Sequence, residues 1–243
     1  MDSLSELTIL IAGATSAAGV ATARALHGAG ATVLVAGSNA ARLNEHLGFA
    51  HGRYEVDLAD HAAVHALAKV IELERGPLDG LIHLVGGWRG GKGLAGQSDA
   101  DWDFLHRNVI TTLRNTTRVF NDALLASPAG RVAIVSATAV GSPSAASANY
   151  VTAKAAAEAW MSCVAAGFNT AQSAHKANPV PQRAAAVTWV IKAFVDDATR
   201  AANPEKAYAG FTDVADLGAA AIDLFTADAA QLNGTRRSLV PSG

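Results

Sequence analysis

Residues 7–19 read Leu-Thr-Ile-Leu-Ile-Ala-Gly-Ala-Thr-Ser-Ala-Ala-Gly, and this stretch decides the fold. Its first six residues form a nearly continuous apolar run, which is typical of a strand buried on both faces of a parallel sheet. The segment from Gly13 to Gly19 predicts a tight turn that leads into a helix over 20–29. Glycines in such a turn let the backbone approach a pyrophosphate, which then meets the positive end of the helix. Two glycines are a weak signal alone, so the interpretation depends on the rest of the chain.

The rest of the chain continues an alternation of strands and helices. Short apolar runs predict strands, and helical periodicity predicts helices between them. The expected strands cover 32–36, 54–56, 81–85, 131–135, 185–190 and 238–240, and the expected helices cover 40–47, 61–75, 101–125, 149–167 and 213–225. This order predicts an α/β fold with a doubly wound, Rossmann-like parallel sheet in a three-layer α/β/α arrangement. No internal repeat or long linker interrupts it, so we expect residues 1–243 to form a single dinucleotide-binding domain.

Composition excludes several classes of protein. Half of the 243 residues are hydrophobic and only 16% are charged, unlike a disordered chain. The net charge of −2 lacks the basic excess that nucleic-acid binding requires. A single cysteine, Cys163, excludes an intramolecular disulfide and a cysteine-rich metal site. The acidic start and the lack of an apolar run of about 20 residues favour a cytoplasmic protein with no membrane span.

The end of the second expected strand bears on the choice of nucleotide. NAD-specific sites usually carry an acid there to hold the ribose hydroxyls, and this chain has Ser38-Asn39 instead. Ser38, Asn39 and Arg42 could contact a 2′-phosphate, which favours NADP, with NAD possible; the alternative for Arg42 is an exposed helix residue. Asp57 follows the third strand, where it either accepts a hydrogen bond from an adenine amino group or caps the next helix.

Tyr150 and Lys154 carry the predicted chemistry. They stand four residues apart at the start of an alanine-rich helix, so they share one face of it. A lysine ammonium beside a phenol stabilises the phenolate and lowers the pKa of the tyrosine from about 10. The spacing therefore predicts a tyrosine suited to acid–base work near neutral pH.

Together these features resemble the short-chain dehydrogenase/reductase family over nearly the whole chain. The matching elements are Ala12-Gly13-x5-Gly19, Asp57, Val85-Gly86, Trp102-Asp103-x4-Asn108-Val109, Gly130-Arg131-Val132 and Tyr150-x3-Lys154. The resemblance implies that Tyr150 protonates a substrate carbonyl, that Lys154 also binds the nicotinamide ribose, and that Asn108 holds a water in the proton relay. The cofactor-binding set that it implies is Gly13, Thr15, Ser16, Ala17, Gly19, Ser38, Asn39, Asp57, Leu58, Val85, Gly86, Gly87, Tyr150 and Lys154. It also implies a homodimer or homotetramer formed through the helices at 101–125 and 149–167.

The chain departs from the family pattern at several positions. Ala17 replaces the middle glycine of the turn, His83-Leu84-Val85-Gly86 replaces Asn-Asn-Ala-Gly, and Ala137 replaces the catalytic serine. Strand alternation should point the neighbouring Ser136 and Thr138 the other way. Gly86-Gly87-Trp88-Arg89-Gly90-Gly91 together with Ala137 resembles the dihydropteridine reductase branch of the family. Trp88 is then a candidate for the substrate pocket, with Ala137 beside it; the alternative for Trp88 is an exposed surface residue.

These observations predict an NAD(P)H-dependent oxidoreductase that acts on a small electron-poor molecule. The acceptor is pteridine-like, quinonoid or carbonyl, because losing one oxyanion donor costs roughly 10²–10³ in rate and selects for a reactive acceptor. The alternative is a non-catalytic NAD(P)-binding sensor or structural protein of the same fold. His61 and His65 are four residues apart but have no evident third ligand, so we expect no metal. The segments 88–93 and 192–211 follow strands and are either part of the site or solvated loops.

Overall fold

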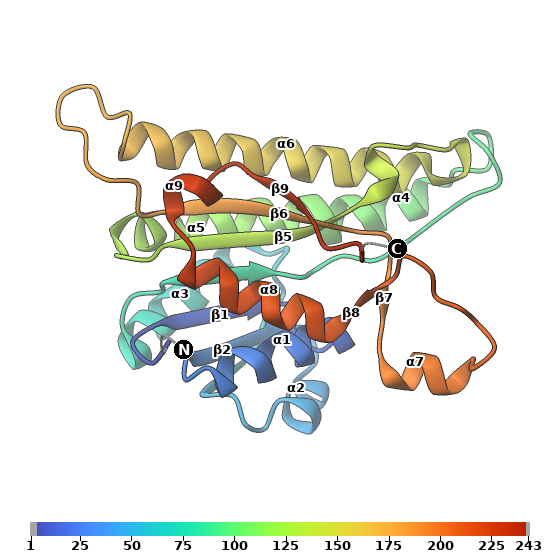
Figure 1. The fold of residues 1–243 in the computed structure, drawn as a ribbon, viewed down its shortest axis with the longest axis horizontal. Coiled ribbons are helices and arrows are strands. Elements are labelled where there is room, and N and C mark those ends of the chain that lie inside the picture. The colour runs from blue at the N-terminus through green and yellow to red at the C-terminus, as the bar shows by residue number, and fades with distance from the viewer. Residues whose placement is uncertain (1–3, 242–243) are drawn as a thin grey trace.

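The central sheet is parallel throughout, as the sequence predicts. The structure, a computed structural model, describes residues 4–241; residues 1–3 of the acidic start and residues 242–243 lie outside the described part. The seven-stranded sheet has the order β3-β2-β1-β4-β5-β6-β9, and all its pairings are parallel (Figure 1). Its strands are β1 (Thr8–Ala12), β2 (Thr32–Gly37), β3 (Gly52–Glu55), β4 (Gly80–His83), β5 (Arg131–Ala137), β6 (Ala185–Ile191) and β9 (Arg236–Ser238). The predicted doubly wound α/β fold is confirmed.

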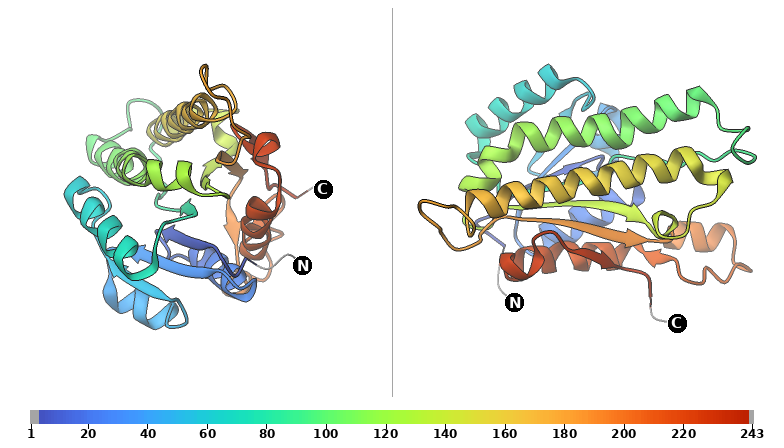
Figure 2. Two further views of the ribbon diagram at one scale, coloured as in Figure 1. Left: turned by 90° about the vertical axis from the view of Figure 1, so that its left-hand side faces the viewer. Right: turned by 90° about the horizontal axis from the view of Figure 1, so that it is seen from above.

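Helices cover both faces of this sheet, as the view along the strands shows (Figure 2). One face packs against α1 (Ala17–Gly28), α2 (Ala40–His46), α8 (Val214–Thr226) and α9 (Ala229–Leu232). The other face packs against α3 (His61–Arg75), α4 (Asp99–Leu105), α5 (Thr112–Ala126) and α6 (Ala148–Ala171). Along β1, Ile9 and Ile11 face the first layer while Leu10 and Ala12 face the second. Burial on both sides explains why the strands are continuous apolar runs.

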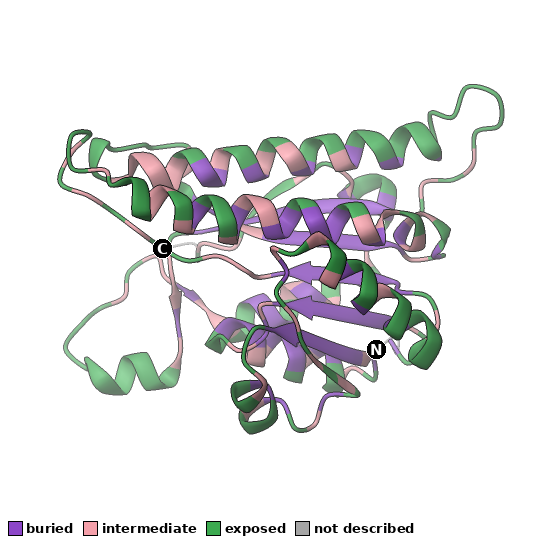
Figure 3. Cartoon of the chain, turned by 180° about the vertical axis from the view of Figure 1, so that it is seen from behind, coloured by how far each residue is buried: buried purple, intermediate pink, exposed green. Residues whose placement is uncertain are grey.

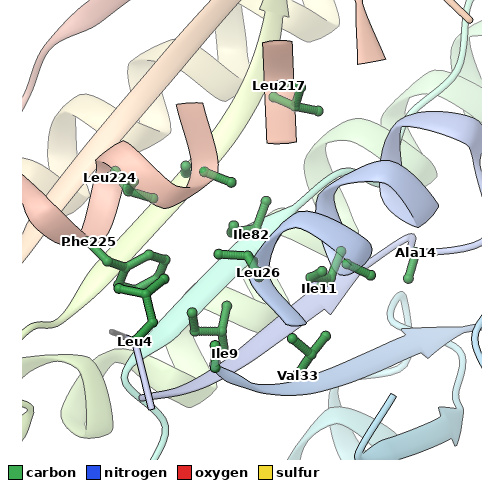
Figure 4. Packing of buried hydrophobic residues seen from close by; sticks show 14 of the residues in the cluster. Leu4, Ile9, Ile11, Ala14, Leu26, Val33, Ile82, Leu217, Leu224 and Phe225 are labelled. Carbon is green, nitrogen blue, oxygen red and sulfur yellow. The ribbon is translucent and has the colours of Figure 1, made fainter. Parts of the chain in front are cut away.

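Close packing of α1, α8 and the sheet depends on small residues. A Cβ added to Gly218 would lie 2.9 Å from the Cβ of Ala25, so α8 approaches α1 more closely than a larger residue would allow. A Cβ added to Gly80 would lie 2.4 Å from the ring of Phe225, which fills the space beside β4. Figure 4 shows Phe225 and Leu224 of α8 in the same layer as Ile9 and Leu26. Phe225 thus packs where β1 and β4 begin, since Gly80 pairs with Ile9.

The expected helix over 101–125 is divided into three parts. A π-helical turn, His106–Thr111, separates α4 from α5. Within it the Asn108 side-chain amide donates to the carbonyl of Phe104 at 2.8 Å, and the Thr112 hydroxyl donates to the carbonyl of Asn108 at 2.6 Å. Side chains that compete for helix carbonyls in this way favour a local change of helix type, and such turns are frequent at functional sites.

Two further elements differ from the prediction. The last strand, β9, lies at 236–238 rather than 238–240, because Arg236–Ser238 pairs with Thr188–Val190 of β6. Residues 192–211 are not a plain loop: they contain β7 (Phe194–Val195) and α7 (Asp197–Ala202), and β8 (Thr212–Asp213) follows them. Figure 3 shows that α7 is exposed and projects from the body of the molecule. Among residues 4–241, none of the helices combines the length and apolar character that a membrane span requires.

Candidate active site

The turn after β1 lies where the strand order reverses, between β1 and β4. Gly13 has φ of +79°, and a Cβ there would lie 2.7 Å from the backbone nitrogen of Val85. A Cβ added to Gly19 would lie 2.5 Å from the carbonyl oxygen of Ala14. Packing within the chain therefore already requires both glycines, in addition to any ligand. A substitution such as Gly13→Val would disrupt the turn itself and would not isolate nucleotide binding.

A cavity of about 400 Å³ opens at this end of the sheet. The turn and the first turn of α1 form one wall, the end of β4 and the residues after it form the floor, and α6 contributes its first two turns. The lining residues are Ser16, Ala17, Ala18, His83, Leu84, Val85, Gly86, Gly87, Trp88, Val135, Tyr150, Lys154, Ile191 and Phe194. The cavity therefore brings together the predicted residues Ser16, Ala17, Val85, Gly86, Gly87, Trp88, Tyr150 and Lys154.

The lining fits the nicotinamide dinucleotide that the family resemblance implies. Ser16 caps α1, with its hydroxyl accepting from the Gly19 N–H at 3.1 Å, and the next two side chains are small. The positive N-terminal end of this helix is thus open to an anionic phosphate. Opposite it, a Cβ added to Gly86 would lie 3.7 Å from Lys154 Nζ, so the glycine leaves room for a sugar beside the ammonium. Ser16, Gly86 and Lys154 are the residues that would hold the nucleotide.

Lys154 is buried and its ammonium is held by the backbone. Nζ donates to the carbonyl oxygen of Val135 at 2.7 Å and lies 6.0 Å from the centre of the Tyr150 ring. Burial lowers the pKa of Lys154 to about 8, against a smaller opposite effect of Glu158. The lysine therefore remains mostly charged at neutral pH and can titrate just above it.

Tyr150 has a pKa shift opposite to the one expected from its sequence spacing. Burial raises the pKa of its hydroxyl above the usual 10, whereas the spacing to Lys154 predicted a lowered value. The physical reason is that the ammonium binds the Val135 carbonyl while the phenol is partly withdrawn from water. A phenol of this kind stays protonated at neutral pH, so it is suited to donate a proton.

His83 links the floor of the cavity to the π-helical turn. Its ring is fully buried, with Nε2 3.1 Å from the Thr112 hydroxyl and Nδ1 3.1 Å from the Thr116 hydroxyl. Because the Thr112 hydroxyl donates to the carbonyl of Asn108, the contacts run from β4 to Asn108. Burial, assisted by the charge of Lys154, lowers the pKa of His83 to about 3. The imidazole is therefore neutral throughout the physiological range.

We expect His83 to make the stability of the protein depend on pH. Between pH 6.5 and about 3 the unfolded chain binds a proton at this residue that the folded chain does not. The free energy of unfolding should therefore fall by about 1.4 kcal/mol for each pH unit below 6.5. His83→Asn, which restores the amide of the family motif, should flatten this slope. Urea unfolding of both proteins at pH 7 and pH 5 checks it, and equal differences between the two pH values would contradict the prediction.

Asp57 and its neighbours lie outside the cavity lining. One carboxylate oxygen of Asp57 pairs with Arg107, and the other accepts from the Ala59 N–H at 2.9 Å. The following helix is instead capped by Asp60, so the capping alternative for Asp57 is wrong. Leu58 is buried, and its carbonyl accepts from the Asn115 amide at 3.1 Å.

A second cavity lies beside the same turn, between α1 and α2. Asn39 caps α2 by accepting from the Arg42 N–H at 2.9 Å, and Ser38 is exposed next to it. The Arg42 guanidinium donates to the carbonyl of Thr15 at 3.1 Å, so this side chain reaches back to the turn. Thr15, Arg42 and Arg24 line this cavity of about 510 Å³. Glu45 and Asp196 also line this cavity, whereas the predicted residues Ser38 and Asn39 do not.

Ala137 does not line the main cavity. It is 3% exposed at the end of β5, and its replacement of a serine removes a hydroxyl from that position. The hydroxyl of the adjacent Ser136 bonds to Glu158, which also binds Arg236 at 3.0 Å. The Ser136 side chain therefore points toward Glu158 and Arg236 and not into the main cavity, as the alternation of side chains along a strand predicted.

Six residues of the cavity lining are not among the site residues predicted from the sequence: Ala18, His83, Leu84, Val135, Ile191 and Phe194. Ile191, the last residue of β6, and Phe194 close the cavity beside that strand. Phe194 lies in the segment 192–211, which was expected to be either part of the site or a solvated loop. Gln97 makes contacts that no sequence pattern signals. The His61 and His65 rings stack edge to face with their centroids 4.6 Å apart, and the described residues contain no group of three ligands for a metal.

Several solved structures are similar to this chain over nearly its whole length. A short chain dehydrogenase from Shigella flexneri 2a in complex with NADP is 22% identical, with a TM-score of 0.82 over 99% of both chains. A gluconate 5-dehydrogenase from Burkholderia cenocepacia with NADP and tartrate is 22% identical, with a TM-score of 0.77 over 98% of this chain and 95% of that one. An NADPH-bound short chain oxidoreductase from Pseudomonas aeruginosa PAO1 with an atypical catalytic centre is 17% identical, with a TM-score of 0.81 over 98% and 96%.

Sequence comparison identifies the family. A 2,3-dihydro-2,3-dihydroxybenzoate dehydrogenase from Bacillus subtilis strain 168 is 29% identical over 160 residues, which are 63% of this chain. The match spans 61% of that relative, less than two thirds of its length. The model of the short chain dehydrogenase family matches residues 7–173, well over half of the chain. The chain therefore belongs to the short-chain dehydrogenase family of NAD(P)-dependent oxidoreductases.

Proposed function

We propose that the protein is an NADPH-dependent reductase that transfers hydride to a small, electron-poor, planar acceptor such as a pteridine-like or quinonoid molecule. The observation that carries this proposal is the chemistry of the cavity lining. Tyr150 and Lys154 provide its proton-bearing groups near the acceptor end, while Leu84, Trp88 and Phe194 make much of the surface apolar. An acceptor that is already strongly electrophilic needs little help at its oxyanion. Ordinary ketones, which depend on that help, are the less favoured substrates.

Different residues of the cavity bind the nucleotide, donate the proton and bind the acceptor. A bound nicotinamide nucleotide supplies the hydride. The N-terminal turn of α1 would bind its phosphates, and Lys154, oriented by the Val135 carbonyl, would bind its ribose beside Gly86. Tyr150 donates a proton from its hydroxyl to the reduced acceptor, and its raised pKa keeps that proton in place until it is needed. Trp88 offers its indole face to a planar acceptor at the mouth of the cavity.

The preference for NADP over NAD is supported by the surroundings of Arg42. No acid directly follows β2, where the chain has Ser38-Asn39, although Glu45 and Asp196 belong to the lining of the cavity around Arg42. Arg42 already lies against the turn, where its guanidinium can pair with a phosphate on the adenosine ribose. The structural neighbours from Shigella flexneri and Burkholderia cenocepacia hold NADP.

A turnover screen tests the proposed function. NADPH and NADH are each offered with quinonoid dihydropterin, simple quinones and simple ketones, and nucleotide oxidation is followed by absorbance. We expect NADPH with the quinonoid acceptors to give the largest kcat/KM. Binding of NADPH without turnover of any acceptor would favour a non-catalytic nucleotide-binding protein, an alternative that Ala17 and Ala137 support. Higher kcat/KM for ketones would point instead to an ordinary carbonyl reductase.

We also propose that residues 1–243 act as one unit. The seven-stranded sheet takes β1 from residues 8–12 and β9 from residues 236–238, so the two ends of the chain contribute to the same sheet. A division of the chain into two domains would therefore split a single sheet.

We predict that the protein forms a homodimer or homotetramer through α4–α5 and α6. The outward face of α6 carries small exposed side chains, which allow a second copy to approach closely; they are Ala156, Ala159, Cys163, Ala166 and Gly167. Light scattering on the purified protein should give a mass of two or four chains. A substitution of Ala159 by arginine should shift the mass toward one chain. A monomer at working concentration in the unchanged protein would contradict the prediction.

A further inference from the structure

The glycine-rich segment 88–98 is a closed loop, and its own packing requires three of its glycines, Gly90, Gly91 and Gly96. A Cβ added to Gly91 would lie 2.4 Å from the carbonyl oxygen of Gly96, and one added to Gly96 would lie 2.7 Å from that of Lys92. A Cβ added to Gly90 would lie 2.6 Å from the Trp88 ring, so the indole rests against the backbone there. The glycines thus allow the loop to fold on itself with Trp88 packed against it.

Gln97 ties this loop to the residues that lead into α6. Its amide nitrogen is within 3.1 Å of the carbonyl oxygens of Gly93 and Ala146 and 3.3 Å from that of Ala145. Its amide oxygen accepts from the Asn149 N–H at 3.0 Å. The amide nitrogen of Gln97 therefore bonds to its own loop and to residues 145–146, and the amide oxygen bonds to residue 149. Figures 1 and 2 both show the loop before α4 beside the start of α6.

Two further hydrogen bonds join the same segments. The Gly91 N–H donates to the carbonyl of Ala146 at 2.8 Å, and the Asn149 side-chain amide donates to the carbonyl of Ser98 at 3.1 Å. These bonds lie on either side of Gln97, which occupies the middle of the contact. Loss of the Gln97 side chain would leave the carbonyls of residues 145 and 146 and the amide of residue 149 with fewer partners.

A second anchor holds the other end of the loop. The Arg89 guanidinium lies 3.7 Å from the centre of the Phe104 ring, donates to the carbonyl of Trp88 at 2.8 Å, and lies 3.5 Å from the Asp101 carboxylate. The loop is therefore attached to α4 near Trp88 and to the start of α6 through Gln97. Trp88, the one residue of this segment that lines the cavity, is thus at an anchored end of the loop.

We propose that Gln97 is a positioning residue that fixes Trp88 relative to Tyr150, so that the acceptor is bound between a rigid wall and the proton donor. Trp88 lies at one end of the clamped loop, and Tyr150 directly follows Asn149, the residue bound by the Gln97 oxygen. Orientation of reacting groups is sensitive to displacements of about 1 Å, so a small loosening of this contact alters the reaction. The catalytic consequence rests on the proposed function, whereas the clamp itself does not.

Steady-state kinetics test the catalytic consequence. Gln97→Leu removes both ends of the amide, and Gln97→Glu keeps an acceptor for the Asn149 N–H but removes the donors. We expect Gln97→Leu to raise KM for the acceptor roughly tenfold, Gln97→Glu to raise it less, and KM for NADPH to stay unchanged in both. Leu94→Ala, a change of an exposed side chain in the same loop, is the matched control and should behave as the wild type. An equal rise in both KM values would overturn the positioning role.

Hydrogen exchange followed by mass spectrometry tests the clamp without relying on turnover. In Gln97→Leu we expect faster exchange in the peptides that cover 88–98 and 145–149, and in Leu94→Ala no change. Faster exchange in only one of these peptides, or in neither, would overturn the clamp. If the wild type reduces no acceptor, the proposed function fails and the exchange result still decides the clamp. If Gln97→Leu does not fold, Gln97→Glu supplies both measurements.

Discussion

Tyr150→Phe is expected to lower turnover of every acceptor by roughly 10²–10⁴-fold, which is the usual contribution of a general acid. The substitution keeps the ring, which packs against the layer between the sheet and α6, and removes only the hydroxyl. Burial raises the pKa of that hydroxyl, so the wild-type group is protonated at neutral pH and available as the donor. Affinity for NADPH should stay nearly unchanged, because the phosphates and ribose bind elsewhere in the cavity. Steady-state kinetics and calorimetric titration with NADPH measure the two effects.

Tyr54→Phe is a matched control for this experiment. The Tyr54 hydroxyl bonds to Glu74 at 3.1 Å, and burial raises its pKa too, but β3 places it at the far edge of the sheet. Removing it should leave turnover at the wild-type level. Full activity of Tyr150→Phe on every acceptor that the wild type reduces would show that another group donates the proton.

Much of the fold could be predicted because the strands are buried on both faces. A strand such as β1 or β6 has no polar face, so its apolar run marks it in the sequence, and the turn at Gly13 marks where the first helix begins. The edge strand β9 lacks this signal, since Arg236, Arg237 and Ser238 are all exposed. The π-helical turn was not predictable either, because it depends on bonds from Asn108 and Thr112 to particular backbone carbonyls.

The part of the candidate site that could be predicted consists of residues that follow the carboxyl ends of the parallel strands. The carboxyl ends of parallel strands meet at one edge, so residues after β1, β4 and β5 were expected to lie together, and the cavity contains Ser16, Gly86 and Tyr150. The predicted direction of the Tyr150 pKa shift was wrong, because the spacing to Lys154 gives no information about the burial that raises the pKa of the phenol. The role of Gln97 was not predictable for a similar reason: its partners at the start of α6 lie 48 to 52 residues away along the chain.

Lys154→Met is expected to weaken NADPH binding by about 10- to 100-fold, the usual worth of a hydrogen bond to a charged group, and to lower turnover as well. Methionine keeps a long unbranched stem in the buried position and removes the charge. The wild-type pKa of about 8 also predicts a pH dependence. Because burial lowers this pKa from its usual value of 10.5, the charge is present at neutral pH and is lost as the pH rises through about 8. The kcat/KM for NADPH, which reports groups of the free enzyme, should therefore fall above that pH.

The pH profile of Lys154→Met shows whether Lys154 or another group causes the fall in kcat/KM above pH 8. Lys154→Met should show a low kcat/KM that no longer falls between pH 7 and pH 9. Lys192→Met, which removes an exposed ammonium that donates to the carbonyl of Ala209 at 2.9 Å, should keep the wild-type profile. Tyr150 cannot supply a transition near pH 8, since burial moves its pKa upward from 10. His83 cannot supply one either, because its pKa lies at about 3. A fall above pH 8 that persists in Lys154→Met would therefore show that the lysine is not the titrating group.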